Sequence, residues 1–211
     1  MEPKKSSNLL ASAQRHGKRF LETGALKGWP NRLTLGRILV IPLILVLYPL
    51  DFRFTDGICV ILFMAAAITD YLDGYLARKH NEVSVLGALL DPVADKMLMA
   101  TALVVLAHAK QLPPLIAGVL LCRDVLVSGL RMVALEQNFK LEVNQFGKIK
   151  TFVADAGIGF LLLRSDEVAG IPAHALGMLA MWAATFLGLY SAYLYVITFS
   201  EKANFSAGTD R

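Results

Sequence analysis

The chain has 211 residues, of which 55% are hydrophobic and 18% are charged, and its mean hydropathy is +0.53. Soluble domains carry about 45–50% apolar and about 25% charged residues, so this composition argues against a soluble protein and favours an integral membrane protein. The net charge of +4 forms no dense basic patch with interleaved aromatic side chains, which excludes the usual pattern of a nucleic-acid-binding protein.

Residues 1–30 form the first predicted unit, a basic cytoplasmic or interfacial segment. They lack the apolar core of a signal peptide, so we expect no cleavage there. Between about Lys5 and Leu26, apolar residues are scattered among basic and polar ones. Two interpretations stay open, namely an amphipathic helix that lies on anionic headgroups and a partly ordered, solvated tail.

Six apolar segments follow, and we interpret each as a transmembrane helix. Lipid offers no hydrogen-bond partner to an open sheet edge, and about 20 helical residues cross the hydrocarbon core. The predicted fold is an all-α integral membrane protein with six transmembrane helices over residues 31–200 and a C-terminal tail over residues 201–211. The six segments run over residues 33–50, 57–77, 88–109, 113–135, 148–164 and 171–199.

Basic residues are concentrated in alternate connections between these segments. Seven lysines and arginines precede the first segment, and others flank the second connection and the fourth, whereas the opposite loops carry only Arg53, Lys110 and Arg164. Because cytoplasmic loops are enriched in lysine and arginine, both termini are predicted to be cytoplasmic. The absence of a transit peptide favours a multi-pass protein of a bacterial inner membrane.

Four aspartates lie at the cytoplasmic ends of the second and third segments. Asp70 and Asp73 are three residues apart and share a helix face, and Asp91 and Asp95 are four apart and share another. Side by side, the two helices would bring four carboxylates together, and their repulsion would be costly without cations. Clustered hard oxygen ligands suit Mg²⁺, Mn²⁺ or Ca²⁺ rather than Zn²⁺. We expect two Mg²⁺ or Mn²⁺ ions, which at about 3.5–4 Å apart clamp a phosphoryl centre during in-line displacement.

Two glycines accompany the aspartates. Gly74 directly follows the second aspartate, and Gly87 lies one turn before the third. Glycine inside a helix costs about 1 kcal/mol relative to alanine, so we expect a substrate or a neighbouring backbone to come close at both positions. The whole pattern reads D-x2-D-G-x2-A-R-x8-G-x3-D-x3-D from Asp70 to Asp95. It resembles the signature of the CDP-alcohol phosphatidyltransferases.

This resemblance implies a reaction, in which an acceptor hydroxyl attacks the lipid-bound phosphorus of a CDP-linked lipid and CMP leaves. It implies that Asp70, Asp73 and Asp91 bind the metals and that Asp95 is the general base, which also touches a metal. The family's members are typically dimers, so a homodimer is expected. The residues expected to bind CDP-diacylglycerol are Asn31, Thr34, Asp73, Gly74, Arg78 and Gly87, with Gly74 against cytidine and Arg78 at the diphosphate.

The stretch WPNRLTLGRILVIP opens the first apolar segment. It resembles the opening of phosphatidylglycerolphosphate synthases, a group within that family, and Asn31, Thr34 and Arg37 match their pattern. The resemblance implies that Asn31 and Thr34 hold the nucleotide, and helix capping is a second interpretation of Asn31. Arg37 lies inside an apolar helix, so we expect it to meet a buried partner or a phosphate.

Four basic residues near the fourth and fifth segments indicate a phosphate site. Arg123 and Arg131 are eight residues apart and share a helix face, and Lys148 and Lys150 open the fifth segment at the same membrane side. Arginine and lysine both bind phosphate, and a helix N-terminus adds partial positive charge. For either lysine alone, cytoplasmic flanking charge is an equal interpretation. Asp124 stands where the synthases commonly have glutamate, and we expect it to pair with an arginine.

The leading hypothesis is therefore an enzyme that converts CDP-diacylglycerol and glycerol 3-phosphate into phosphatidylglycerol phosphate and CMP. It would need a divalent metal and no organic cofactor, and its site would open to the cytoplasm and sideways to membrane lipids. An inositol-phosphate transferase and a cardiolipin synthase are alternatives within the same fold. A divalent metal transporter is an alternative of another class, although its acids would be expected at the membrane midplane. A non-enzymatic membrane scaffold would leave the aspartates unexplained.

Overall fold

The structure is a computed structural model that describes the backbone of residues 29–50, 54–80, 85–137, 139, 141–142, 144–168 and 170–209. Within these ranges, the side chains of residues 29–34, 70–80, 85–91 and 203–209 are outside the description. The predicted N-terminal segment therefore lies almost wholly outside the described residues, as does Arg53.

Every long element of the described chain is an α-helix. The elements are α2 (Trp29–Leu47), the short 3-10 helix η1 (Tyr48–Leu50), α3 (Thr55–His80), α4 (Val85–His108), α5 (Pro114–Glu136), α6 (Gln145–Leu162) and α7 (Ala173–Thr209). Each of the six α-helices covers one of the six predicted apolar segments. α7 has 37 residues, and it continues through most of the segment that the sequence analysis set apart as a C-terminal tail.

Local sequence explains several helix ends. α5 begins at Pro114, where a missing N–H costs nothing because the first N–H groups of a helix have no partner within it. α6 begins after Asn144, whose side-chain oxygen accepts a hydrogen bond of 3.2 Å from the backbone N–H of Phe146. Beyond α6, Arg164 has a positive φ of 49°, a conformation that cannot continue a right-handed helix. These signals place the α4–α5, α5–α6 and α6–α7 connections.

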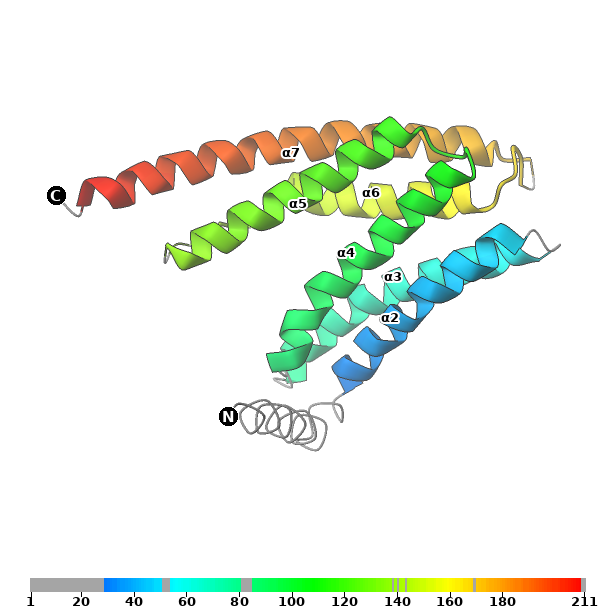
Figure 1. Cartoon of the computed structure of the whole chain (residues 1–211), viewed down its shortest axis with the longest axis horizontal. Coiled ribbons are helices and arrows are strands. Elements are labelled where there is room, and N and C mark those ends of the chain that lie inside the picture. The colour runs from blue at the N-terminus through cyan, green and yellow to red at the C-terminus, as the bar shows by residue number, and fades with distance from the viewer. Residues whose placement is uncertain are drawn as a thin grey trace, which may run out of the picture.

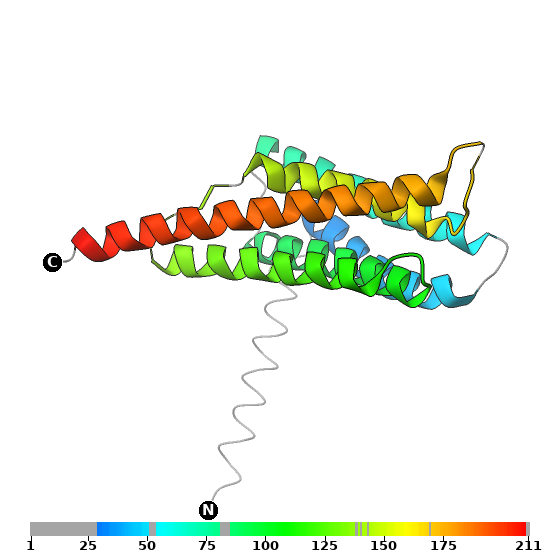
Figure 2. The same cartoon turned by 90° about the horizontal axis from the view of Figure 1, so that it is seen from above.

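The helices pack in two groups, one made of α5, α6 and α7 and the other of α2, α3 and α4. α7 lies along α5 and α6, and α2 packs against α3 and α4 (Figures 1 and 2). α6 also contacts α3 and α4, so it joins the two groups. α4 and α5 meet at their connection and separate toward their other ends (Figure 1).

The α6–α7 contact is close because small residues meet there. A Cβ atom added to Gly177 would lie 2.8 Å from Leu161 Cγ and 3.2 Å from the carbonyl oxygen of Gly157. A Cβ on Gly157 would in turn lie 3.2 Å from the carbonyl oxygen of Gly177. Small residues at such contacts let two helix backbones approach closely, which favours helix association in membranes.

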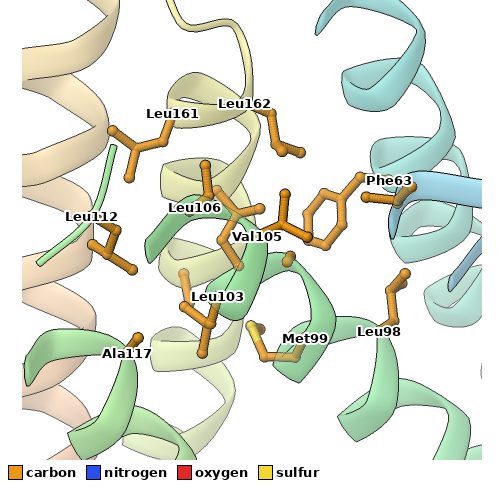
Figure 3. Packing of buried hydrophobic residues seen from close by; sticks show 14 of the residues in the cluster. Phe63, Leu98, Met99, Leu103, Val105, Leu106, Leu112, Ala117, Leu161 and Leu162 are labelled. Atoms are coloured by element: carbon orange, nitrogen blue, oxygen red, sulfur yellow. The ribbon is translucent and has the colours of Figure 1, made fainter. Parts of the chain in front are cut away.

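One hydrophobic core connects all six α-helices. In Figure 3, Phe63 of α3, Leu106 of α4 and Leu162 of α6 converge in its centre. Ile44 of α2, Leu120 of α5 and Met181 of α7 belong to the same buried cluster, and each is at most 1% exposed. Where these side chains would otherwise be exposed to water, burial of their apolar surface is the main favourable contribution to the free energy of helix packing.

The outer surface of the described helices is also apolar. Large contiguous apolar patches are rare on soluble monomers, so this surface suits a lipid environment. Among the described residues, the segment Ala173–Lys202 is long and apolar enough to cross a membrane, and Leu35–Leu50 and Thr55–Thr69 are shorter apolar helices. The following side chains are at least 62% exposed: Leu39, Val46, Ile61, Val125, Phe152, Leu179 and Phe186.

Arg164, which the sequence analysis counted as a loop charge, ties three helices at one end of the bundle. Its guanidinium donates to the carbonyl oxygen of Tyr48 and lies 3.8 Å from the centre of the Tyr48 ring. Its Nε lies 3.5 Å from Oδ1 of Asp56. The end of α6 is thereby joined to η1 and to the start of α3, at the end of the bundle opposite to the predicted metal site.

Candidate active site

The four aspartates lie in two consecutive helices. Asp70 and Asp73 lie in the last three turns of α3, and Asp91 and Asp95 lie in the first three turns of α4. Only residues 81–84 separate the two helices, so both acidic helix ends lie at the same end of the bundle. The side chain of Asp95 is half-buried, and it is the one member of the predicted metal set whose side chain is described. No group of three metal-binding side chains forms among the described residues alone.

The residues predicted to bind CDP-diacylglycerol lie in three helices that contact one another. Asn31 and Thr34 belong to α2, and α2 packs against both α3 and α4. Gly74, Arg78 and Gly87 belong to the acidic helix ends, and all five side-chain positions are outside the description. About two turns into α2, Arg37 is 2% exposed, a burial that fits the expected buried partner or phosphate.

Asp124 holds two of the predicted phosphate-binding cations together. Its Oδ1 accepts a hydrogen bond of 2.8 Å from Arg123 Nη1, and its Oδ2 lies 2.8 Å from Lys150 Nζ. The Lys150 side chain is 2% exposed, that of Arg123 is 9% exposed and that of Asp124 is 19% exposed. The expected pairing of Asp124 with an arginine is confirmed, and Lys150 completes a cluster with net charge +1.

α7 supplies two further partners for Arg123. Arg123 Nε donates to the carbonyl oxygen of Gly188 at 3.0 Å, and Nη2 donates to Ser191 Oγ at 2.9 Å. A Cβ on Gly188 would already lie 3.6 Å from Lys150 Cγ and 3.8 Å from Arg123 Nε, so a larger side chain would fill the space of both cations. Three of the five N–H donors of Arg123 are used in this way, which leaves two for a ligand.

Arg131 lies two turns further along α5 and has a different partner. Its Nη2 donates to the hydroxyl of Tyr195 at 2.5 Å, and its guanidinium carbon lies 5.2 Å from the centre of the Tyr195 ring. The same hydroxyl accepts a hydrogen bond of 3.1 Å from the backbone N–H of Asn144. Tyr195 is 4% exposed, so one buried phenol on α7 connects α5 to the start of α6.

The structure does not bring all four predicted cations to one point. Lys148 is exposed, whereas Lys150 is buried, because two residues apart on a helix means roughly 200° of rotation. Arg131 is eight residues beyond Arg123, about 12 Å along the helix axis. The described site therefore consists of the Asp124 cluster and of a separate Arg131–Tyr195 pair.

α7 supplies residues of this site that the sequence pattern did not predict. None of the predicted site residues lies on the sixth apolar segment, yet Gly188, Ser191 and Tyr195 all contact predicted cations. A signal was present, because these three residues follow the i, i+3, i+7 spacing of one helix face. Polar and small residues in line on an apolar helix indicate a face turned toward protein rather than lipid.

Asp95 and the two arginines can be located by counting along α4 and α5 from the connection between these helices. Asp95 lies 13 residues, about 20 Å, before the end of α4. From the start of α5, Arg123 lies about 14 Å along the helix and Arg131 about 26 Å. Because α4 and α5 diverge from their connection (Figure 1), these lengths by themselves do not bring the carboxylate beside either arginine.

Residues 28–190 match the family model of the CDP-alcohol phosphatidyltransferases. The chain belongs to this family. The chain is 34% identical over 170 residues to a Rickettsia typhi protein named CDP-diacylglycerol–glycerol-3-phosphate 3-phosphatidyltransferase, a match that covers 81% of this chain and 96% of the relative. A Bacillus subtilis protein of the same name is 36% identical over 79% of this chain and 92% of its own length. A third protein of this name, from Salmonella choleraesuis, is 35% identical over 73% of this chain and 89% of its own.

Proposed function

We propose that the chain transfers the phosphatidyl group of CDP-diacylglycerol to glycerol 3-phosphate, which gives phosphatidylglycerol phosphate and CMP. The observation that carries this proposal is the family match together with relatives of 34–36% identity that share one enzyme name. That name favours glycerol 3-phosphate over inositol phosphate or phosphatidylglycerol as the acceptor. It also favours an enzyme over a metal transporter.

The acidic ends of α3 and α4 would hold the metal. Four carboxylates in two adjacent helix ends are a donor set that suits two Mg²⁺ or Mn²⁺ ions. Such ions would supply positive charge that stabilises the diphosphate and the CMP leaving group. In this proposal Asp70, Asp73 and Asp91 are ligands, and α2 presents Asn31 and Thr34 to the nucleotide beside Gly74, Arg78 and Gly87.

Asp95 would take the proton from the acceptor hydroxyl. A general base in position contributes about 10²–10⁴-fold to a rate. The described side chain of Asp95 is half-buried and lies within an apolar helix, a setting where carboxylates are rare and usually functional. In this proposal the acceptor's phosphate meets the cations while its hydroxyl faces Asp95.

The cations of α5 and α6 would hold the acceptor's phosphate. Arg123 retains two N–H donors after its contacts with Asp124, Gly188 and Ser191. Guanidinium groups suit bidentate phosphate binding, and Lys150 adds a point charge. A net positive cluster would repel choline or ethanolamine, so the charge favours an anionic acceptor.

The same proposal extends to the setting of the enzyme. The helices α2 to α7 would be six membrane spans, with both chain termini and the site on the cytoplasmic side of a bacterial inner membrane. The acyl chains of CDP-diacylglycerol would lie against the apolar outer surface, and the protein would act as a homodimer. The exposed apolar side chains of the described helices support a surface that faces lipid or a second subunit.

An acceptor panel tests the proposed reaction. Purified protein with CDP-diacylglycerol and Mg²⁺ is offered glycerol 3-phosphate, inositol phosphate, serine or phosphatidylglycerol in turn, and released CMP is measured. We expect CMP and phosphatidylglycerol phosphate with glycerol 3-phosphate, and at most background release with the others. Preferred release with another acceptor would reassign the substrate, and no release with any acceptor would reject the transferase.

A further inference from the structure

The basic residues of the site differ in how their charges are compensated. Arg123 and Lys150 share the carboxylate of Asp124, and Lys148 is exposed. Arg131 is half-buried, and no carboxylate among the described side chains pairs with it. Its polar partner is the neutral hydroxyl of Tyr195, which leaves the positive charge of Arg131 without a compensating carboxylate among the described side chains.

The contacts of Tyr195 hold Arg131 in one orientation. The phenol oxygen lies 2.5 Å from Nη2, and the ring lies beside the guanidinium, with 5.2 Å between its centre and the guanidinium carbon. The ring is packed against Val127 of α5 and Ala192 of α7 in a small apolar cluster, so it cannot follow the arginine if that side chain moves. A guanidinium kept in place by a rigid neutral group loses less entropy when it binds an anion.

Tyr195 also links Arg131 to the start of α6. Its hydroxyl accepts the backbone N–H of Asn144, the residue whose side chain caps that helix. Leu141 from the α5–α6 connection packs against the same apolar cluster. The tyrosine therefore sets the position of a cationic side chain and of a helix N-terminus with partial positive charge at the same time.

From these contacts we infer that Tyr195 is a positioning residue that aims Arg131 at the phosphomonoester group of the acceptor. The inference rests on the proposed function and adds to it that Arg131, rather than the Asp124 cluster alone, sets the affinity for that phosphate. Arg131 lies nearer than Arg123 to the C-terminal end of α5, which leads into the α5–α6 connection on the side from which a water-soluble acceptor would enter in the proposed orientation.

The variant Tyr195→Phe tests this inference, because it removes the hydroxyl and keeps the packed ring. With CDP-diacylglycerol and Mg²⁺ present, we expect the KM for glycerol 3-phosphate to rise about tenfold, as for the loss of one hydrogen bond to a charged group. The KM for CDP-diacylglycerol should change by less than about twofold. Tyr193→Phe is the matched control, since Tyr193 lies on the same helix and is 61% exposed, and it should behave as the wild type.

A double-variant cycle separates positioning from a general structural effect. Arg131→Ala should raise the KM for glycerol 3-phosphate by more than Tyr195→Phe does, and the double variant should match Arg131→Ala alone, because the tyrosine acts through the arginine. Additive effects, or equal changes in both KM values, would overturn the inference, as would an unchanged KM in Tyr195→Phe. If the wild type uses glycerol 3-phosphate while Tyr195→Phe is unaffected, only this inference fails. If the wild type releases no CMP, the proposed function itself fails.

Discussion

At the scale of single residues, Asp124 is the group that holds Arg123 and Lys150 together. It pairs with Arg123 at 2.8 Å and with Lys150 at 2.8 Å, and Lys150 is almost completely buried. If the carboxylate of Asp124 is removed, Arg123 keeps its contacts with Gly188 and Ser191. Lys150, in contrast, loses its acidic partner among the described residues. A buried charge without a partner is costly, so the stability of this cluster rests on the aspartate.

Asp124→Ala should therefore destabilise the protein by about 3 kcal/mol, the low end for breaking a buried ion pair. The additional change Lys150→Met removes the stranded charge and keeps most of the side-chain volume. The double variant should be more stable than Asp124→Ala alone, which thermal unfolding in detergent would measure. A double variant that is less stable than the single one would show that Lys150 gains its stability from other contacts.

At the scale of helices, the pair α6 and α7 positions the site. Lys150 on α6 pairs with Asp124 on α5, and Gly188 and Ser191 on α7 accept hydrogen bonds from Arg123. The distances between these three helices therefore decide whether the cluster forms. Gly157 and Gly177 set the distance between α6 and α7 through backbone contacts. Small residues at these positions therefore act on the site from about two to three turns away.

Gly177→Ala should destabilise the protein, although alanine is the better helix former by about 1 kcal/mol. The new Cβ would lie 2.8 Å from Leu161 Cγ, and overpacking of this kind costs about 1–3 kcal/mol. Gly118→Ala in α5 is the control, because no atom lies within 4 Å of its added Cβ. The unfolding temperature should fall for Gly177→Ala and stay equal or rise for Gly118→Ala, and the opposite order would contradict the close packing.

At the scale of the whole molecule, the two ends of the bundle carry different chemistry. At one end, Arg164 contacts Tyr48 and Asp56, and these contacts join the end of α6 to η1 and to the start of α3. The acidic ends of α3 and α4 lie at the opposite end. Because the helices alternate in direction, residues that are distant in sequence meet in the same half of the molecule.

The proposed metal site at that acidic end makes activity depend on divalent ions. Treatment with EDTA should reduce CMP release to background, and Mg²⁺ or Mn²⁺ should restore it, because four carboxylates without cations repel one another and leave the diphosphate charge uncompensated. The unfolding temperature is followed in the same samples, so that loss of fold is distinguished from loss of metal. Full turnover after complete chelation would reject the metal-assisted mechanism.

The sequence by itself determined the helices, the acidic motif and the family. The six apolar segments correspond to six described α-helices, because the length of an apolar segment can be read from consecutive residues. The spacing of Asp70, Asp73, Asp91 and Asp95 can be read from the chain in the same way. Helix periodicity alone would also have separated Lys148 from Lys150. The expected partner of Arg123 was found because Asp124 is its neighbour in the chain.

The tertiary structure was needed to bring Lys150 to Asp124 and to show that α7 completes the site. Ser191 lies 68 residues from Arg123, and Tyr195 lies 64 residues from Arg131, so no local pattern pairs them. Their contacts depend on the packing distance between α5, α6 and α7, which small residues on facing helices set together. The charge balance of the site follows from that packing, because burial decides whether a cation needs a carboxylate or remains available for a phosphate.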